Sequence, residues 1–242
     1  MRTAIFGGTF DPIHSAHLEM ARHAADQYRL DRVLFIPAGN PPHKRSEESF
    51  EHRYRMVELA CAEDPRFVPS RLEEGEAKSY SIDSIERVKA ACTASAANAA
   101  VPVPNGAPTN AAATAPNAAA PAPNAAATAP NARALVPNAP AAPNPAGDEA
   151  LFFIIGSDAF AEIQSWHRWE DVIRAVEFIV VARPGHEIAV PPGARVHRLD
   201  SVELPVSSSD IRDALARGET PQELPPAIAA YIRAHQLYRT VR

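Results

Sequence analysis

A pair of histidines three residues apart follows a glycine-rich turn near the start of the 242-residue chain. The turn and the pair form residues 7–17 (GGTFDPIHSAH), directly after a short apolar run at residues 3–6. Glycine allows a phosphate to approach the backbone closely, and the free N–H groups at the start of a helix favour an anion. His14 and His17 would add hydrogen-bond donors there. The pattern indicates a site for the phosphates of a nucleoside triphosphate.

Two simpler interpretations of the histidine pair stay open. His14 and His17 are also compatible with a helix cap and an ordinary surface pair. A metal site is the second alternative, because residues three apart share a helix face, although the sequence shows no evident third and fourth ligand. The turn lacks the G-x-G-x-x-G spacing of dinucleotide-binding folds and the lysine of a phosphate loop, which argues against both of those classes.

The order of predicted elements places this turn at one edge of an α/β sheet. Strands are predicted at residues 3–6, 32–37, 66–69, 151–155, 178–182 and 195–199. Helices are predicted at residues 17–24, 51–62, 81–91, 208–217 and 226–235. Strands that are almost wholly apolar are typical of parallel sheets covered on both faces. We therefore expect a Rossmann-like, open, mostly parallel sheet with helices on both faces and a small helical part at the carboxyl end. Its ligand site would lie beyond the carboxyl ends of the strands.

A low-complexity segment of Ala, Pro, Asn and Thr occupies residues 93–147 and holds 11 of the 24 prolines. Pro-Asn pairs recur in it every seven residues, and proline removes a helix hydrogen bond and clashes with the preceding turn, so this repeat is expected to be extended or disordered. We interpret it as an insertion. The chain is then a single domain, residues 1–242, interrupted at about 93–147.

Composition and charge are those of a soluble globular protein. Hydrophobic residues make up 46% of the chain, and 24 Lys+Arg against 29 Asp+Glu give a net charge of −5, which does not favour a nucleic-acid partner. No stretch approaches the roughly 18 apolar residues of a membrane span, and the first residues lack the apolar run of a signal peptide. Cys61 and Cys92 lie far apart, as expected of reduced thiols. We expect a cytoplasmic protein without a membrane partner.

Four further segments carry residues suited to nucleotide chemistry. They are residues 37–44 (PAGNPPHK), 78–81 (KSYS), 156–158 (GSD) and 206–212 (VSSSDIR). Serines at the start of a helix cap it, and Arg212 offers a fork of donors to phosphate oxygens. Lys44 would act as a point charge over phosphates, and Trp166, eight residues beyond Asp158, offers a flat face for stacking.

Together these segments resemble the nucleotidylyltransferase superfamily, whose H-x-G-H histidines bind the phosphates of ATP or CTP, and within it the nicotinate-nucleotide adenylyltransferases. Here the histidine motif reads H-S-A-H, with Ala16 in place of the glycine, and residues 206–212 are similar to the I-S-S-T-x-I-R motif. The resemblance spans both blocks and omits the insertion. It implies an enzyme of NAD biosynthesis that joins nicotinate mononucleotide to the AMP part of ATP. The products would be nicotinate adenine dinucleotide (deamido-NAD) and pyrophosphate.

The resemblance also implies two substrate sites and a Mg²⁺ ion held mainly by the ATP phosphates. The implied catalytic residues are His14, His17, Lys44 and Arg212. Those implied for ATP are Gly7, Gly8, Thr9, Phe10, His14, His17, Gly156, Asp158, Ser207, Ser208, Ser209 and Arg212. Those implied for nicotinate mononucleotide are Gly8, Thr9, Lys44, Tyr80, Ser81, Asp158, Trp166 and His167.

Alternatives remain for single residues and for the function of the whole chain. Lys44 is also compatible with a solvated lysine, Trp166 with a core residue and Asp158 with a helix cap. Asp11 is equally compatible with a phosphate-loop role and with a turn residue before Pro12. For the whole chain, the rivals are a sister adenylyltransferase acting on nicotinamide mononucleotide or phosphopantetheine, a cytidylyltransferase, and a non-catalytic nucleotide-binding scaffold. The KSYS and GSD segments argue against the sister enzymes. The oligomeric state stays open, a homo-oligomer included.

Overall fold

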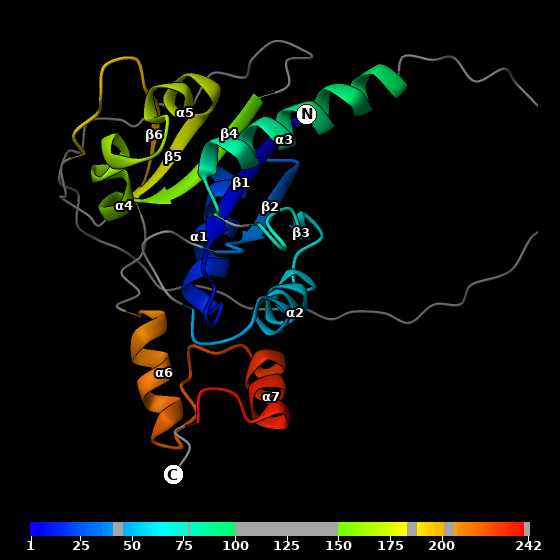
Figure 1. Cartoon of the computed structure of the whole chain (residues 1–242), viewed down its shortest axis with the longest axis vertical. Coiled ribbons are helices and arrows are strands. Elements are labelled where there is room, and N and C mark those ends of the chain that lie inside the picture. Colours follow the sequence, from blue (N-terminus) through cyan, green and yellow to red (C-terminus); the bar gives the residue numbers. More distant parts are fainter. Residues whose placement is uncertain (41–45, 77, 100–149, 183–187, 201–205, 240–242) are drawn as a thin grey trace, which may run out of the picture.

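A single parallel sheet forms the centre of the protein (Figure 1). The computed structural model describes residues 1–40, 46–76, 78–99, 150–182, 188–200 and 206–239. Within them, six strands pair in the order β3-β2-β1-β4-β5-β6, all parallel to their neighbours. The strands are β1 (Arg2–Gly8), β2 (Arg32–Pro37), β3 (Phe67–Pro69), β4 (Ala150–Gly156), β5 (Glu177–Ala182) and β6 (Arg195–Asp200). This confirms the predicted Rossmann-like sheet.

Helices cover both faces of the sheet, because alternate strand residues point to opposite sides. The described helices are α1 (Ser15–Gln27), α2 (Phe50–Cys61), α3 (Ser81–Ala99), α4 (Ser157–Ala161), α5 (Trp169–Ala175), α6 (Ser208–Ala216) and α7 (Pro226–His235), with a short 3₁₀ turn at Ile163–Ser165. On β4, Phe152 and Ile154 pack in the core shared with α1, α2 and α7. Their neighbours Phe153 and Ile155 pack in the second core, with α3, α4 and α5.

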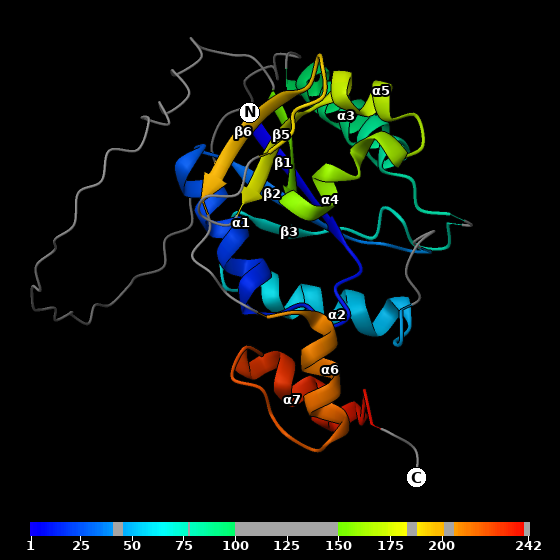
Figure 2. The ribbon, with the colours of Figure 1, turned by 90° about the vertical axis from the view of Figure 1, so that its left-hand side faces the viewer.

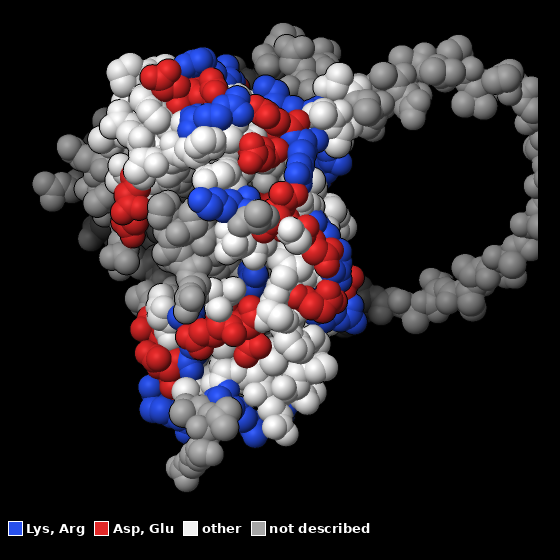
Figure 3. All heavy atoms as spheres, in the orientation of Figure 1, with Lys and Arg blue, Asp and Glu red and all other residues white. Residues whose placement is uncertain are grey.

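The small helical part at the carboxyl end lies beside α2. Figures 1 and 2 both show α6 and α7 together at one end of the molecule. Ile228 and Ile232 of α7 join the same core cluster as Met56 and Val57 of α2. On the face seen in Figure 3, acidic and basic side chains are interspersed.

The predicted helix at residues 81–91 was too short, because α3 continues to Ala99. Residues 93–99 (TASAANA) are mostly alanine and contain no proline, and the first proline of the low-complexity segment is Pro102. Alanine is the strongest helix former, so the helix runs on until prolines approach. The rest of the predicted insertion, residues 100–147, lies outside the described residues. Helices α4 and α5 were not among the predicted helix ranges, although the helix-cap interpretation of Asp158 agrees with the start of α4.

The sheet joins strands from before and after the insertion, since β1 lies between β2 and β4. We propose on this basis that residues 1–242 form one interrupted domain. Replacing residues 100–147 by a 12-residue Gly/Ser linker should raise the free energy of unfolding by about 1 kcal/mol, because a shorter loop costs less closure entropy. Urea denaturation followed by circular dichroism measures this. A marked loss of stability would show that the segment packs against the domain.

Candidate active site

Two adjacent cavities open at the carboxyl ends of β1 and β4, the central pair of strands. This is the point where the strand order reverses direction, and open α/β sheets bind ligands there. The larger cavity has a volume of about 690 Å³ and the smaller about 340 Å³. The two cavities adjoin at a shared wall. Its residues line both cavities: Phe6, Gly7, Gly8, Thr9, Ile154, Ile155, Gly156 and Ala159.

The two histidines lie in the larger cavity with their rings in contact. His14 is the N-cap of α1 and His17 lies in its first turn, with ring centroids 3.9 Å apart. The backbone N–H of His14 donates to Nδ1 of His17 at 3.3 Å, so the neutral His17 ring carries its proton on Nε2. His14 is only 3% exposed. In the part of the chain that the structure describes, its Nδ1 is the one buried side-chain nitrogen or oxygen without a hydrogen-bond partner.

Burial keeps both histidines neutral near pH 7. It lowers the pKa of His14 to about 4. It also holds the pKa of His17 well below the ordinary value of 6.5, and the neighbouring His14 ring lowers it further. Two neutral rings at a helix N-terminus act as hydrogen-bond partners for an anion rather than as fixed positive charges.

The lowered pKa of His14 predicts that the fold loses stability in acid. Between pH 6.5 and 4 the unfolded chain holds a proton on His14 that the folded chain does not, so stability falls as pH falls through this window. We expect roughly 3 kcal/mol from this group. Urea unfolding at pH 7 and at pH 4.5, compared with His14→Asn, measures it. Equal pH profiles for the two proteins would contradict the assignment.

The start of α6 supplies the opposite side of the larger cavity, which Ser207, Ser208, Ser209 and Arg212 all line. The Ser207 hydroxyl caps α6 by accepting from the backbone N–H of Asp210 at 3.2 Å. Arg212, whose side chain is 21% exposed, donates to the carbonyl of Asp11 and to the Glu47 carboxylate, both at 2.8 Å. The structure therefore brings the predicted C-terminal motif to the histidines.

The smaller cavity has aromatic walls. Tyr80, Ser81, Trp166 and His167, all predicted for the nicotinate side, line it. The Trp166 ring meets Phe153 edge to face, with centroids 6.0 Å apart, and the Tyr80 and His167 rings lie 4.5 Å apart. Trp166 is half-buried, so its two interpretations apply together: one part of the ring packs on the core and another faces the cavity.

Two predicted residues, Asp158 and Phe10, have a different structural setting from the one predicted. Asp158 is exposed in the first turn of α4 and does not line either cavity, which favours its interpretation as a residue of the helix start. Lys44 lies outside the described residues. Phe10 lines the larger cavity, but its ring is buried and packs on Phe6 and Phe35, with centroids 5.6 and 5.8 Å apart.

Sequence reasoning missed a buried glutamate in the smaller cavity, Glu73. Its carboxylate accepts from the Ser84 hydroxyl at 2.5 Å and from the backbone N–H of Gly39 at 3.4 Å. Ser79 lines the same cavity, and its hydroxyl accepts from the backbone N–H of Asn40 at 3.0 Å. The sequence offered one indirect signal for this part of the site. Ser84, the partner of Glu73, lies three residues after the predicted site residue Ser81 and therefore on the same helix face.

Among the described residues, no three His, Cys, Asp or Glu side chains come close enough to hold a metal ion together. None of the helices in the described ranges has the length and apolar character needed to cross a bilayer.

A doubly wound sheet with two adjoining cavities at its switch point, one lined by two histidines and an arginine and the other by aromatic rings, is typical of nucleotide-binding enzymes. Residues 5–214 match the model of the cytidylyltransferase-like family. The chain belongs to that family and, within it, to the nicotinate-nucleotide adenylyltransferases. This confirms the enzyme and the role in NAD biosynthesis that the sequence motifs predicted.

The relatives support this assignment over the full length. The probable nicotinate-nucleotide adenylyltransferase of Solibacter usitatus (strain Ellin6076) is 45% identical over 240 residues, which cover 98% of this chain and all of that protein. The one of Exiguobacterium sibiricum is 32% identical over 243 residues, covering 99% and 100% of the two chains. The structure of Plasmodium falciparum nicotinic acid mononucleotide adenylyltransferase complexed with NaAD aligns with a TM-score of 0.63. It is 16% identical and covers 98% of this chain and 97% of that one, which supports the fold.

Proposed function

We propose that the larger cavity binds ATP and the smaller cavity binds nicotinate mononucleotide. The observation that carries this proposal is the shared wall of Gly7, Gly8 and Thr9, which lines both cavities. Two nucleotides bound on either side would meet there, with the 5′-phosphate of the mononucleotide opposite the α-phosphorus of ATP. Close approach is what an in-line displacement requires.

The reaction we propose is a direct transfer. An oxygen of the mononucleotide phosphate forms a bond to the α-phosphorus of ATP, and the bond from that phosphorus to the β-phosphate oxygen breaks. Nicotinate adenine dinucleotide forms and pyrophosphate leaves with the electron pair. The attacking phosphate is already an anion, so a general base adds little, and catalysis consists of alignment and charge stabilisation.

The larger cavity offers the donors for this charge. His17 presents Nε2–H, and Arg212 retains guanidinium N–H groups beyond those bound to Asp11 and Glu47. We propose Lys44 as a further cation over the phosphates, by the family resemblance alone.

The smaller cavity suits a pyridine ring with a carboxylate. Trp166 would stack on the ring. The long helix α3 begins at Ser81, which lines the cavity, and the first N–H groups of a helix attract an anion. A carboxylate accepts two such bonds, whereas an amide nitrogen cannot accept any. This difference would select nicotinate over nicotinamide.

We propose that Mg²⁺ enters with ATP and is held by its phosphate oxygens. The chemistry of the described residues fits this, because the larger cavity offers neutral histidines and hydroxyls rather than a carboxylate cluster. When bound, the ion neutralises phosphate charge. A cytoplasmic location is also proposed, in keeping with Cys61 and Cys92, which are free thiols.

Pyrophosphate release from ATP and Mg²⁺ tests the proposal. Nicotinate mononucleotide, nicotinamide mononucleotide and phosphopantetheine are compared as acceptors in parallel. We expect selective turnover of the nicotinate substrate. Preference for another acceptor would overturn the substrate assignment, and ATP binding without turnover of any acceptor would favour a non-catalytic scaffold.

Replacing Trp166 with alanine should raise the KM for nicotinate mononucleotide about tenfold, because the stacking face is lost, and should leave the KM for ATP within about twofold. Trp166→Phe keeps a flat ring and should retain most of the affinity. Steady-state kinetics measure the KM for nicotinate mononucleotide and the KM for ATP in each variant. Trp169→Phe is the matched control, since Trp169 lines neither cavity among the residues described. An unchanged KM in Trp166→Ala would assign the ring to the core only.

A further inference from the structure

Arg53 of α2 is the largest of the described side chains that are fully buried, with 1% of the residue exposed. A guanidinium removed from water without compensation is strongly unfavourable, so its partners identify what it holds in place. Its Nη1 donates to the backbone carbonyl of Thr9 at 2.7 Å, and its Nε donates to the carbonyl of Glu48 at 3.2 Å. Arg53 thus joins the shared wall to the segment that leads into α2.

The acidic groups that interact with Arg53 include residues that line each of the two cavities. Burial lowers the pKa of Arg53, and the neighbouring groups Asp11, Tyr238 and Glu73 oppose this shift. Asp11 lines the larger cavity and Glu73 lines the smaller one. Arg53 is thus a buried cation that donates to Thr9, a residue of the wall that the two cavities share.

The turn that Arg53 supports needs outside support. Phe10, directly after Thr9, has φ of 48°, a left-handed conformation that is unfavourable for a bulky residue. The far side of the same turn is held as well: the Asp11 carboxylate accepts from the Tyr238 hydroxyl at 2.7 Å and from the backbone N–H of Glu47 at 2.6 Å. The turn is thereby fixed from two directions.

We propose that Arg53 is a positioning residue for the transfer step, which acts through the carbonyl of Thr9 to hold the shared wall where the two nucleotides meet. This inference rests on the proposed assignment of the two cavities. Arg53 lines neither cavity among the residues described, so it contacts no substrate in this arrangement. Its effect is on the alignment of the phosphates more than on their binding.

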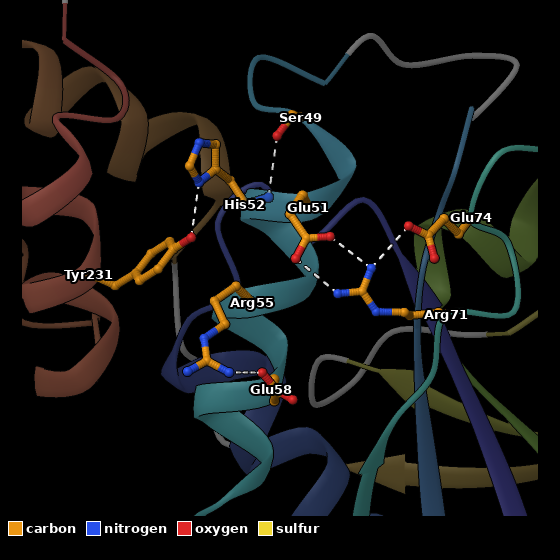
Figure 4. Close-up of polar contacts among 8 residues, drawn as sticks. All are labelled: Ser49, Glu51, His52, Arg55, Glu58, Arg71, Glu74 and Tyr231. Carbon is orange, nitrogen blue, oxygen red and sulfur yellow. Dashed lines mark hydrogen bonds and ion pairs between the residues drawn. The ribbon is translucent and has the colours of Figure 1, made fainter.

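The test compares Arg53→Lys with a matched control on the same helix. Lysine keeps the positive charge, but its single ammonium group cannot reproduce the fork that spans Thr9 and Glu48. We expect kcat per folded molecule to fall at least tenfold, with the KM for ATP changed less than threefold. The control is Arg55→Lys, because Arg55 is exposed and pairs with Glu58 on the surface of α2 (Figure 4). It should keep the wild-type kcat.

Folded fractions are measured by circular dichroism at the assay temperature, because loss of Arg53 also destabilises the fold. A purely structural role would lower the folded fraction and leave kcat per folded molecule unchanged, and that result would overturn the proposal. Tyr238→Phe serves as the second variant if Arg53→Lys does not fold. It removes one hydroxyl from the other side of the turn and should lower kcat three- to tenfold. A wild-type kcat in Tyr238→Phe would then overturn the proposal.

Amide hydrogen exchange of residues 9–14 gives a readout that does not depend on turnover. We expect exchange there to accelerate at least fivefold in Arg53→Lys and not in Arg55→Lys. Unchanged exchange would overturn the positioning role. Absence of turnover in the wild-type protein would instead refute the proposed function, so the two failures are distinguishable.

Discussion

Replacing His17 with alanine is expected to lower kcat for adenylyl transfer about 10²- to 10³-fold, the usual cost of removing one preorganised donor from a transition state. The bond from the His14 backbone fixes the tautomer of His17, so Nε2–H is already oriented before substrate binds. The free energy of unfolding should change little. Alanine is a better helix former than histidine in the first turns of α1, which offsets the loss of the packing contacts of the ring.

Initial rates of pyrophosphate release at saturating ATP and nicotinate mononucleotide measure this effect. His235→Ala is the control, since His235 ends α7 and lines neither cavity in the described ranges. The control should turn over at the wild-type rate. If His17→Ala also does so, His17 has no part in the mechanism and the anion site must be built from other groups.

Replacing Gly39 with alanine is expected to disrupt the smaller cavity. A Cβ at this position would lie 1.9 Å from the backbone carbonyl oxygen of Glu73, a contact that only a backbone shift can relieve. The cost should be about 1–3 kcal/mol of unfolding free energy, as for an overpacked core. The KM for nicotinate mononucleotide should rise at least tenfold, because the shift moves Glu73 and the residues bound to it.

Urea denaturation and steady-state kinetics measure the two effects of Gly39→Ala separately. Gly156→Ala is the control for stability only, since a Cβ at Gly156 meets no atom within 4 Å and its φ of −71° suits alanine. That variant should lose well under 1 kcal/mol. Equal stability losses in the two variants would show that the crowding at Gly39 is relieved without cost.

The parts of the fold and site that could be predicted are those that local sequence determines. The turn at residues 7–17 joins a strand to a helix within one stretch of chain, so its role was readable from residue types and spacing. Apolar runs likewise predicted the central strands. The start of α6 was predictable for the same reason, because Ser207 caps the helix locally.

The remainder depends on contacts between distant segments. Arg53 is one polar residue in a helical pattern, and only the packing of α2 beneath the turn shows that it is buried. Glu73 becomes part of the site because Gly39 allows the backbones to approach. Asp11 shows the same limit. Its turn interpretation and its phosphate-loop interpretation were equally compatible with the sequence, and the structure places its carboxylate on Tyr238 and Glu47.

The bond between the Tyr238 hydroxyl and the Asp11 carboxylate connects residues 227 positions apart. Because a chain is synthesised from its amino end, Asp11 leaves the ribosome well before Tyr238. The glycine-rich turn is therefore synthesised long before the residue that holds its far side, and nascent chains carry it without that support. Contacts of such long range are formed late and slow the folding of a domain. The bond that holds the far side of the turn can therefore form only after residue 238 has been synthesised.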